Sequence, residues 1–201
     1  MHVVRDRTKN SLWLSKEKYV TKVLQIFNMH DAKPVGWTLP INYKLSTNQC
    51  PKTKVEKVEM NKIPYALAVR SLMYAMVCTR PDIAYVIRVV SRFMSNPRRE
   101  HWVVVKWILR YLRGTSSVCL RFGSGNPTLE GYTDSDMSAD VDTSRSMFGY
   151  VMTYARGDVL WLARLKKAVA LSTTEVEYMA AIEADKEIIW MKEFIGELGI
   201  W

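Results

Sequence analysis

The sequence predicts an α/β (α+β) protein, in which a helical first part is followed by three antiparallel strands and a long helix. Apolar residues recur at helical spacing through much of the chain before residue 113. After about residue 125, apolar and polar residues alternate over three short segments, as they do in strands. The chain has 201 residues, 48% of them hydrophobic and 24% charged, so it is long enough to bury a core.

The first predicted elements are a short strand-like segment, a turn and one helix. Residues 8–10 form the turn, and Leu12, Trp13 and Leu14 follow it. Ser15 is the predicted N-cap of a helix whose apolar residues are Tyr19, Val20, Val23, Leu24 and Phe27. Residues 33–63 contain three prolines and several lysines, so we expect a long exposed connection there.

Three helices are predicted next, over residues 64–77, 81–94 and 98–113. Pro81 and Asp82 mark the start of the second, and Gly114 ends the third. The third helix places four basic residues within about 60° of one another, with Trp102 between them and the apolar side; the four are Arg99, Lys106, Arg110 and Arg113. Such a stripe could follow a phosphate backbone, and the alternative is an ordinary solvated helix face.

The second part of the chain contains the predicted strands. Residues 128–136 form the first strand, with Tyr132, Asp134 and Asp136 on one face because side chains alternate. Residues 146–154 and 159–164 form a hairpin, with Arg156-Gly157-Asp158 as its turn. A long helix begins near residue 173, where Ser172 and Glu175 have the spacing of a capping box.

Charge is distributed unevenly between the two parts. Residues 1–125 carry a net charge of +15 and residues 126–201 a net charge of −6, which together make the +9 of the chain. This asymmetry favours a phosphate-binding platform joined to a metal-binding or catalytic part. The alternative, that the charge serves solubility alone, explains a net charge but not its division.

The cysteines and the N-terminus indicate an intracellular protein. Cys50, Cys78 and Cys119 lie far apart and are odd in number, so we expect plain thiols and neither a disulfide framework nor a zinc site. The first residues lack the apolar run of a signal peptide, and no segment approaches 18 consecutive apolar residues. We therefore expect no membrane partner.

Glu177 differs from the other acids of the last helix. Steps of three and four residues from it meet only apolar side chains, at Ala181, Ala184, Ile188, Met191 and Ile195. We expect this face to pack on the sheet, where an unpaired carboxylate is costly and a cation would compensate. Asp134 is the natural co-ligand, and hard oxygen ligands indicate Mg²⁺ or Mn²⁺.

Two other interpretations apply to the acidic residues. Asp134, Asp136 and Ser138 begin like a calcium-binding loop, but Ala139 stands where its glycine should be and Arg145 where its last Glu should be. The second alternative is an acidic turn that binds no metal. Asp140 and Asp142 are predicted to be such turn residues.

Several blocks of sequence, in order, resemble the Pol polyprotein of copia-type LTR retrotransposons across nearly the whole chain. They are Leu12-Trp13-Leu14-Ser15 with Lys18-Tyr19, Ser71-Leu72-Met73-Tyr74 with Thr79-Arg80-Pro81-Asp82-Ile83-Ala84, His101-Trp102 with Lys106-Trp107-Ile108-Leu109-Arg110-Tyr111-Leu112-Arg113-Gly114-Thr115, Gly131-Tyr132-Thr133-Asp134-Ser135-Asp136, and Ala170-Leu171-Ser172-Thr173-Thr174-Glu175 with Glu177-Tyr178. The resemblance implies the end of a reverse transcriptase followed by a truncated ribonuclease H-like domain.

The resemblance also implies an activity and a domain plan. Such a ribonuclease H cuts RNA in an RNA–DNA hybrid with two metal ions, and Asp134 and Glu177 match two of its catalytic acids. Residues 1–60 would correspond to the end of the polymerase palm and thumb, 61–125 to a helical connection, and 126–201 to the ribonuclease H-like part. The expected partners are nucleic acid and the rest of the polyprotein, in cytoplasmic virus-like particles or the nucleus.

The sequence departs from the family pattern in ways that bear on catalysis. No Tyr-x-Asp-Asp is present, and the chain ends where the family continues to further acids. We therefore expect a catalytically incomplete fragment that binds nucleic acid. The alternatives are an active ribonuclease completed by a second chain and an interaction module reused by a host.

Overall fold

The chain folds into two compact units, each of which is described by itself. The computed structural model describes residues 1–39, 44–123, 127–167 and 169–199. The helical unit comprises Met1–His2 and Ser15–Cys119, and the sheet unit comprises Val3–Leu14 and Leu120–Trp201. This mixture of helices and antiparallel strands confirms the predicted α/β class. The assignment of residues 1–60, 61–125 and 126–201 to parts of a polymerase and a ribonuclease stays a prediction.

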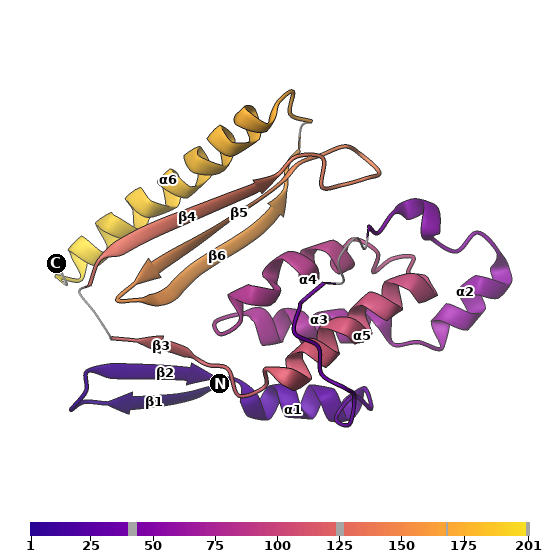
Figure 1. The fold of residues 1–201 in the computed structure, drawn as a ribbon, viewed down its shortest axis with the longest axis horizontal. Helices are drawn as coiled ribbons and strands as arrows, with labels where there is room; N and C mark the ends of the chain where they lie inside the picture. The colour runs from indigo at the N-terminus through magenta and orange to yellow at the C-terminus, as the bar shows by residue number, and fades with distance from the viewer. Residues whose placement is uncertain (40–43, 124–126, 168, 200–201) are drawn as a thin grey trace. The chain divides into compact units, whose positions relative to one another are not determined.

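The helical unit contains five α-helices and two short 3-10 helices within the described residues (Figure 1). They are α1 (Glu17–Ile26), η1 (Thr47–Gln49), α2 (Lys54–Asn61), α3 (Tyr65–Met76), η2 (Pro81–Ile83), α4 (Ala84–Ser91) and α5 (Arg99–Gly114). The four helices predicted from apolar spacing are confirmed. The second of the three central ones begins as the 3-10 turn η2 and ends at Ser91 rather than at residue 94.

The expectation of an exposed connection over residues 33–63 is wrong for its second half. Residues 54–61 form α2, which begins with a capping box: the Glu56 amide donates to Thr53 Oγ1 over 3.2 Å, and the Thr53 amide donates to Glu56 Oε2 over 3.3 Å. Leu45 and Met60 are buried. The prolines of this segment obscured a helix start that Thr53 and Glu56 encode. Pro40, one of these prolines, lies outside the described residues.

The core of the helical unit is apolar, with the buried cation of Arg80 held at its border. Side chains of α1, α3, α4 and α5 form the core, including the fully buried Leu72 and Ile108. Arg80, 2% exposed, donates to both carboxylate oxygens of Asp82 over 2.7 to 3.2 Å and to the Thr115 carbonyl over 2.9 Å. Every nitrogen of this guanidinium is therefore bonded, and the start of α4 is tied to the end of α5.

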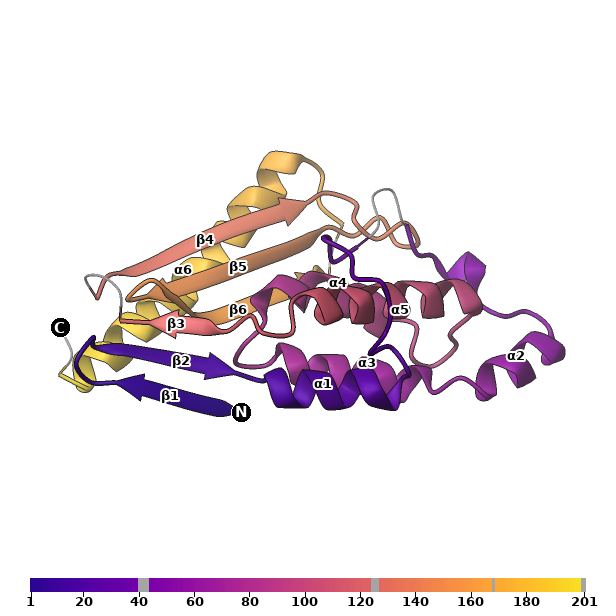
Figure 2. The same ribbon diagram turned by 60° about the horizontal axis from the view of Figure 1, so that its bottom comes forward.

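The sheet unit contains two three-stranded sheets and one long helix (Figure 2). The first sheet has the order β1 (His2–Asp6), β2 (Ser11–Ser15), β3 (Leu120–Phe122), and the second has the order β4 (Leu129–Asp136), β5 (Met147–Tyr154), β6 (Gly157–Leu165). In the second sheet, neighbouring strands are antiparallel, with Asp134 opposite Gly149 and Tyr150 opposite Leu162. The predicted strands and hairpin are thus confirmed.

Helix α6 (Thr173–Glu197) covers one face of the second sheet (Figure 1). Phe148, Tyr150 and Met152 of β5 pack against Ala180 and Ala184 of α6. The small side chains of α6 let the helix lie close to the strands. No helix in the part of the chain that the structure describes is long and apolar enough to cross a membrane.

The turn of the β5–β6 hairpin lies earlier than predicted. Tyr154 ends β5 and Gly157 begins β6, so the connecting residues are Ala155 (φ 50°) and Arg156 (φ 62°). Both adopt the left-handed conformation that tight hairpin turns require. Gly157 serves packing instead, because a Cβ there would lie 2.2 Å from Phe122 Cδ1 of β3. The glycine that suggested the turn marks a close approach between the two sheets.

Candidate metal centre and nucleic-acid interface

The first predicted ligand, Asp134, lies on β4 at one edge of the second sheet. Its side chain is exposed, and Asp134 Oδ1 accepts a hydrogen bond of 2.9 Å from the amide of Ser135. Tyr132 and Asp136, two residues away on either side, are also exposed. The edge position leaves the carboxylate of Asp134 accessible to a ligand.

The second predicted ligand, Glu177, lies near the start of α6. Ser172 caps this helix, because its Oγ accepts a hydrogen bond of 3.1 Å from the Glu175 amide. Glu175 does not complete the predicted capping box with Ser172, since its Oε2 accepts from the Leu171 amide over 2.7 Å. Both bonds fix the first turn, and the turn sets the direction of Glu177.

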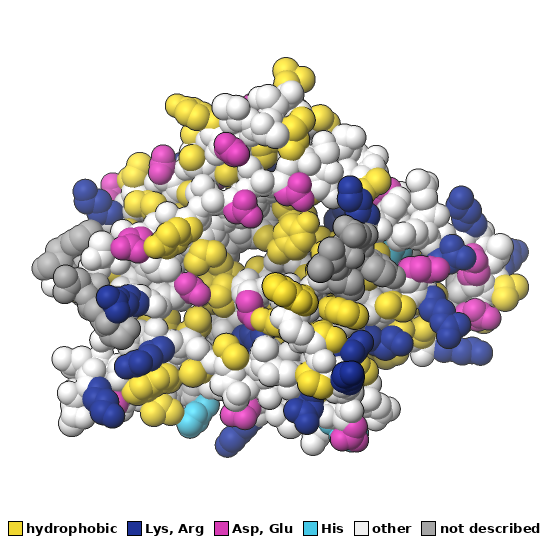
Figure 3. All heavy atoms as spheres, viewed as in Figure 1, with side chains coloured by type: hydrophobic (Ala, Val, Ile, Leu, Met, Phe, Trp, Pro, Cys, Tyr) yellow, Lys and Arg dark blue, Asp and Glu magenta, His cyan; other side chains and the backbone are white. Residues whose placement is uncertain are grey.

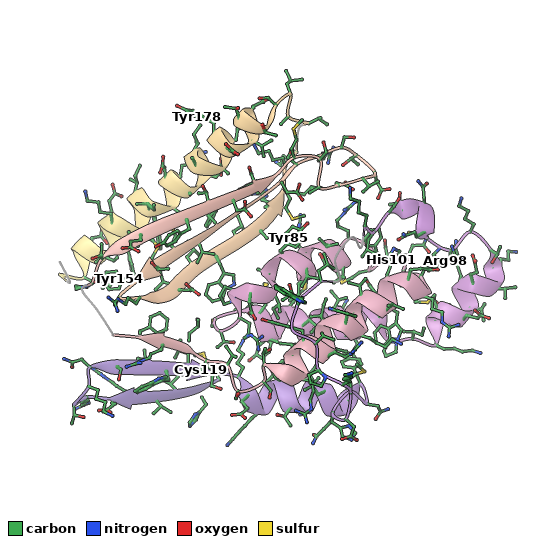
Figure 4. All side chains as sticks on the ribbon, viewed as in Figure 1. Tyr85, Arg98, His101, Cys119, Tyr154 and Tyr178 are labelled. Carbon is green, nitrogen blue, oxygen red and sulfur yellow. The ribbon has the colours of Figure 1, made fainter. Side chains whose placement is uncertain are left out.

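Asp134 and Glu177 border the same hollow, between β4 and the start of α6. The hollow has a volume of about 420 Å³. Its lining residues are Thr133, Asp134, Ser135, Thr174, Glu177, Tyr178, Ala180 and Ala181. Figure 4 shows Tyr178 projecting outward from the first half of α6, and its side chain is 71% exposed. The structure thus brings together the two acids that the sequence paired.

The reason given for a metal at Glu177 is nevertheless wrong, because Glu177 is exposed. In the first two turns of α6 the buried residues are Val176 and Ala180, one position before Glu177 and Ala181. The predicted apolar face is correct only from Ala184 onward. Neither Asp134 nor Glu177 is desolvated, so burial does not require a cation at either carboxylate, and the site is inferred from their proximity alone.

The two carboxylates suit a hard cation whose remaining coordination positions are filled by water or substrate. Within residues 1–39, 44–123, 127–167 and 169–199, no group of three or more His, Cys, Asp or Glu side chains could hold a metal ion. Mg²⁺, however, commonly binds one or two protein carboxylates and fills its other positions with water and substrate phosphates. Asp134 and Glu177, with the Thr174 hydroxyl nearby, meet that requirement.

The acids that follow β4 form a turn, as predicted. Asp140 is 1% exposed, and its Oδ1 accepts a hydrogen bond of 3.0 Å from the Asp142 amide. Asp140 Oδ2 accepts from the Thr143 hydroxyl over 2.5 Å. Asp140 therefore closes its own loop and does not face the hollow.

The basic stripe of α5 separates into two groups. Arg110 donates from Nε to the Lys33 carbonyl over 2.7 Å, and Arg113 donates from Nε to the His30 carbonyl. These two side chains hold the chain that follows α1. Arg99, Trp102 and Lys106 instead line a second hollow, of about 510 Å³, between α2 and α5. The sequence pattern could not separate the two groups, because they share one helix face.

Charge gathers differently over the two units. Lys and Arg side chains cluster over the α2 end of the helical unit, and Asp and Glu side chains are frequent over β4 and α6 of the sheet unit (Figure 3). A residue beside the site whose packing role the sequence pattern did not indicate is Gly131, three positions before Asp134, where the side chains of Ile188 and Met152 occupy the space of a Cβ. Its signal was a glycine inside a predicted strand.

Comparison with known proteins gives several relatives. No protein-family model matches the chain, and no solved structure matches it. Over 200 residues the chain is 57% identical to the retrovirus-related Pol polyprotein from transposon TNT 1-94 of Nicotiana tabacum, covering 100% of this chain and 15% of that protein. Over 195 residues it is 34% identical to the Pol polyprotein from transposon RE1 of Arabidopsis thaliana, covering 96% of this chain and 13% of that protein.

A third relative is much shorter. Over 133 residues the chain is 44% identical to secreted RxLR effector protein 161 of Plasmopara viticola, which covers 66% of this chain and 94% of that protein. The chain therefore spans a small part of the polyproteins that it matches and most of this effector. The chain aligns over its full length with one Pol polyprotein and over 96% of its length with another. It therefore belongs to the copia-type retrotransposon Pol polyprotein family.

Proposed function

We propose that this chain is the reverse transcriptase–ribonuclease H region of the polyprotein, and that it binds RNA–DNA hybrid but does not cut it unaided. One observation carries the proposal: Asp134 and Glu177 border a single hollow between β4 and α6. These are the two positions at which the chain resembles the acids of a ribonuclease H.

The residues of this hollow suit phosphodiester chemistry. A bound Mg²⁺ or Mn²⁺ would activate a water molecule and stabilise the charge that develops on the phosphate. Asp134 and Glu177 would hold the ion. Because both carboxylates are exposed, a phosphate of the nucleic acid could reach the bound ion from solvent. Thr174 offers a hydroxyl to the bound strand.

Catalysis by two metal ions needs more acidic ligands than the two that border this hollow. We therefore propose that another part of the polyprotein, in the same or a second chain, completes the site. Hybrid binding would come from the basic residues, because residues 1–125 carry a net charge of +15.

The test is cleavage and binding of a labelled RNA–DNA hybrid in Mg²⁺ or Mn²⁺. We expect binding without cleavage, and binding that Mn²⁺ strengthens in the wild type but not in Asp134→Asn or Glu177→Gln. Cleavage by the wild type that both variants lose would show that the site is complete by itself. Absence of hybrid binding by correctly folded protein would reject the proposal.

The second candidate function is an interaction module outside a polyprotein. The match to effector protein 161 favours it, because 94% of that separate, shorter protein aligns with 66% of this chain. The two candidates differ in electrostatics. Nucleic-acid affinity falls steeply with salt, whereas an interaction module would show no salt-dependent affinity for hybrid.

A further inference from the structure

The hollow between α2 and α5 has a framework that is held in place by ion pairs. The guanidinium of Arg98 lies 2.7 Å from Glu56 Oε1 and 3.5 Å from Glu100 Oε2. Glu56 Oε2 accepts from the amides of Thr53 and Lys52. Figure 4 shows Arg98 at the start of α5, beside α2. Arg98 therefore binds two acids that line the hollow, Glu56 and Glu100, and these ion pairs hold that side of the hollow in place.

Two cations of the lining remain at the surface. Arg99 and Lys106 are exposed and lie seven residues apart on α5, which is two turns or about 10 Å along the helix. Both residues line the hollow of about 510 Å³. A flexible anion such as a nucleotide phosphate can reach cations at this spacing, and Arg is well suited to phosphate oxygens.

The floor of the hollow is apolar and includes an aromatic ring. Met60, Ile63 and Trp102 line it. Trp102 is half-buried and meets the rings of Phe27 and Tyr65 at interplanar angles of 65° and 59°, so neither ring is stacked parallel on the indole. An aromatic ring beside cations is the arrangement on which bases of single-stranded nucleic acid stack.

One acid of the lining, Glu59, is not among the partners of Arg98. Glu59 is exposed on α2 and lines the hollow. Its carboxylate only accepts hydrogen bonds, so it favours a ligand with N–H donors. The exocyclic amino groups of adenine and cytosine are such donors, whereas uracil has no exocyclic amino group and offers only its ring N3–H.

We infer that this hollow binds one unstacked nucleotide of a single-stranded segment, with its phosphate at Arg99 and Lys106, its base against Trp102, and an exocyclic amino group at Glu59. The inference rests on the proposed function, since it assumes that the chain binds nucleic acid. It adds a preference that duplex binding alone does not predict: a hybrid with a single-stranded extension binds more tightly than a blunt one.

The experiment measures the affinity of the full chain, by fluorescence anisotropy, for a blunt RNA–DNA hybrid and for the same hybrid with a short adenosine extension. We expect the wild type to bind the extended hybrid about tenfold more tightly, as a stacked base contributes on this scale. The Arg99→Gln/Lys106→Gln double variant should lose this preference. The Lys57→Gln/Lys62→Gln variant is the control, because it removes two exposed charges outside the hollow and should keep the preference.

A uridine extension tests the role of Glu59. The wild type should prefer adenosine to uridine, and Glu59→Gln should reduce that difference. Equal affinity of the wild type for blunt and extended hybrids would overturn the inference while leaving the proposed function intact. A preference that survives in Arg99→Gln/Lys106→Gln would also overturn it. Failure to bind either hybrid would overturn the proposed function and the inference together.

Discussion

Gly131 of β4 lies directly against Ile188 of α6. A Cβ at position 131 would come within 2.5 Å of Ile188 Cδ1 and 3.0 Å of Met152 Sδ, distances at which atoms must move. The glycine leaves room for the Ile188 side chain against the strand. Asp134 follows on the same strand and Glu177 precedes on the same helix, so this contact lies between the two elements that carry the acids.

Gly131→Ala should therefore weaken both the fold and the site. We expect the free energy of unfolding to fall by about 1 kcal/mol, the low end of the cost of overpacking, because the ends of the Ile188 and Met152 side chains can shift. Urea denaturation followed by circular dichroism measures it. Gly36→Ala is the matched control, since no atom lies within 4 Å of its Cβ position. Ile188→Val should restore part of the loss, and an unchanged stability in Gly131→Ala would refute the close contact.

The Arg80–Asp82 pair predicts an acid dependence of stability. Burial raises the pKa of Asp82, but the hydrogen bonds and charge of Arg80 lower it by more, so the pKa lies below its ordinary value. The carboxylate thus contributes stability above the ordinary pKa, and this contribution is lost as pH falls toward the lowered one. Urea denaturation between about pH 5 and pH 2 should show a shallower loss in Asp82→Asn than in the wild type. Identical profiles would contradict this role.

Metal binding should depend on the two acids and not on their neighbour. We expect Asp134→Asn and Glu177→Gln each to weaken Mn²⁺ binding by about tenfold or more, since even outer-shell changes act on that scale. Titration calorimetry gives the affinity. Asp136→Asn is the control, because Asp136 is exposed two residues along β4 but does not line the hollow. An equal loss of Mn²⁺ affinity in all three variants would indicate that the ion is attracted by the overall negative charge and not bound at a defined site.

Hybrid affinity should fall with salt, and the slope should depend on the exposed cations of α5. Each phosphate contact with a single strand contributes about 0.7 to the slope of log K against log salt, so Arg99→Gln/Lys106→Gln, whose side chains share one phosphate, should reduce it by about 0.7. Arg110→Ala should mainly lower stability, because its Nε holds the Lys33 carbonyl. Measurements at several salt concentrations on the hybrid with the adenosine extension, with thermal melts alongside, separate these effects. A slope that the double variant leaves unchanged would remove α5 from the interface.

The edge position of β4 predicts self-association of the chain. An edge strand offers unpaired backbone groups to another copy, and charged side chains oppose this. We expect light scattering to detect oligomers at high protein concentration, and Tyr132→Lys to reduce them, because Tyr132 is exposed on β4. A monodisperse monomer in the wild type would contradict the prediction.

The sequence predicts well those features that depend on local periodicity. The helices of residues 64–113 and the strands of residues 129–165 follow apolar spacing and turn residues, which neighbouring residues determine. Asp134 and Glu177 were paired because each lies at a recognisable place in its element, and they border one hollow. Local pattern and position in the element were sufficient for these predictions.

The sequence predicts poorly what depends on packing between elements. One residue of offset in the first turns of α6 moves Glu177 from a buried to an exposed position, because Val176 and Ala180 face the sheet instead. Arg110 and Arg99 share a helix face, but only Arg110 bonds the segment before α2. The spacing of residue types along a helix does not predict which part of that helix a distant loop will cover.

The Ala155–Arg156 turn has a consequence for the order of folding. Left-handed backbone costs residues other than glycine about 1–2 kcal/mol each, so this turn opposes closure of its own hairpin. Closure must therefore be driven by packing along β5, where Phe148, Tyr150 and Met152 contact α6. We expect the β5–β6 hairpin to form late in folding, after α6 has packed on the sheet. When α6 detaches from the sheet, this hairpin should be the first to open.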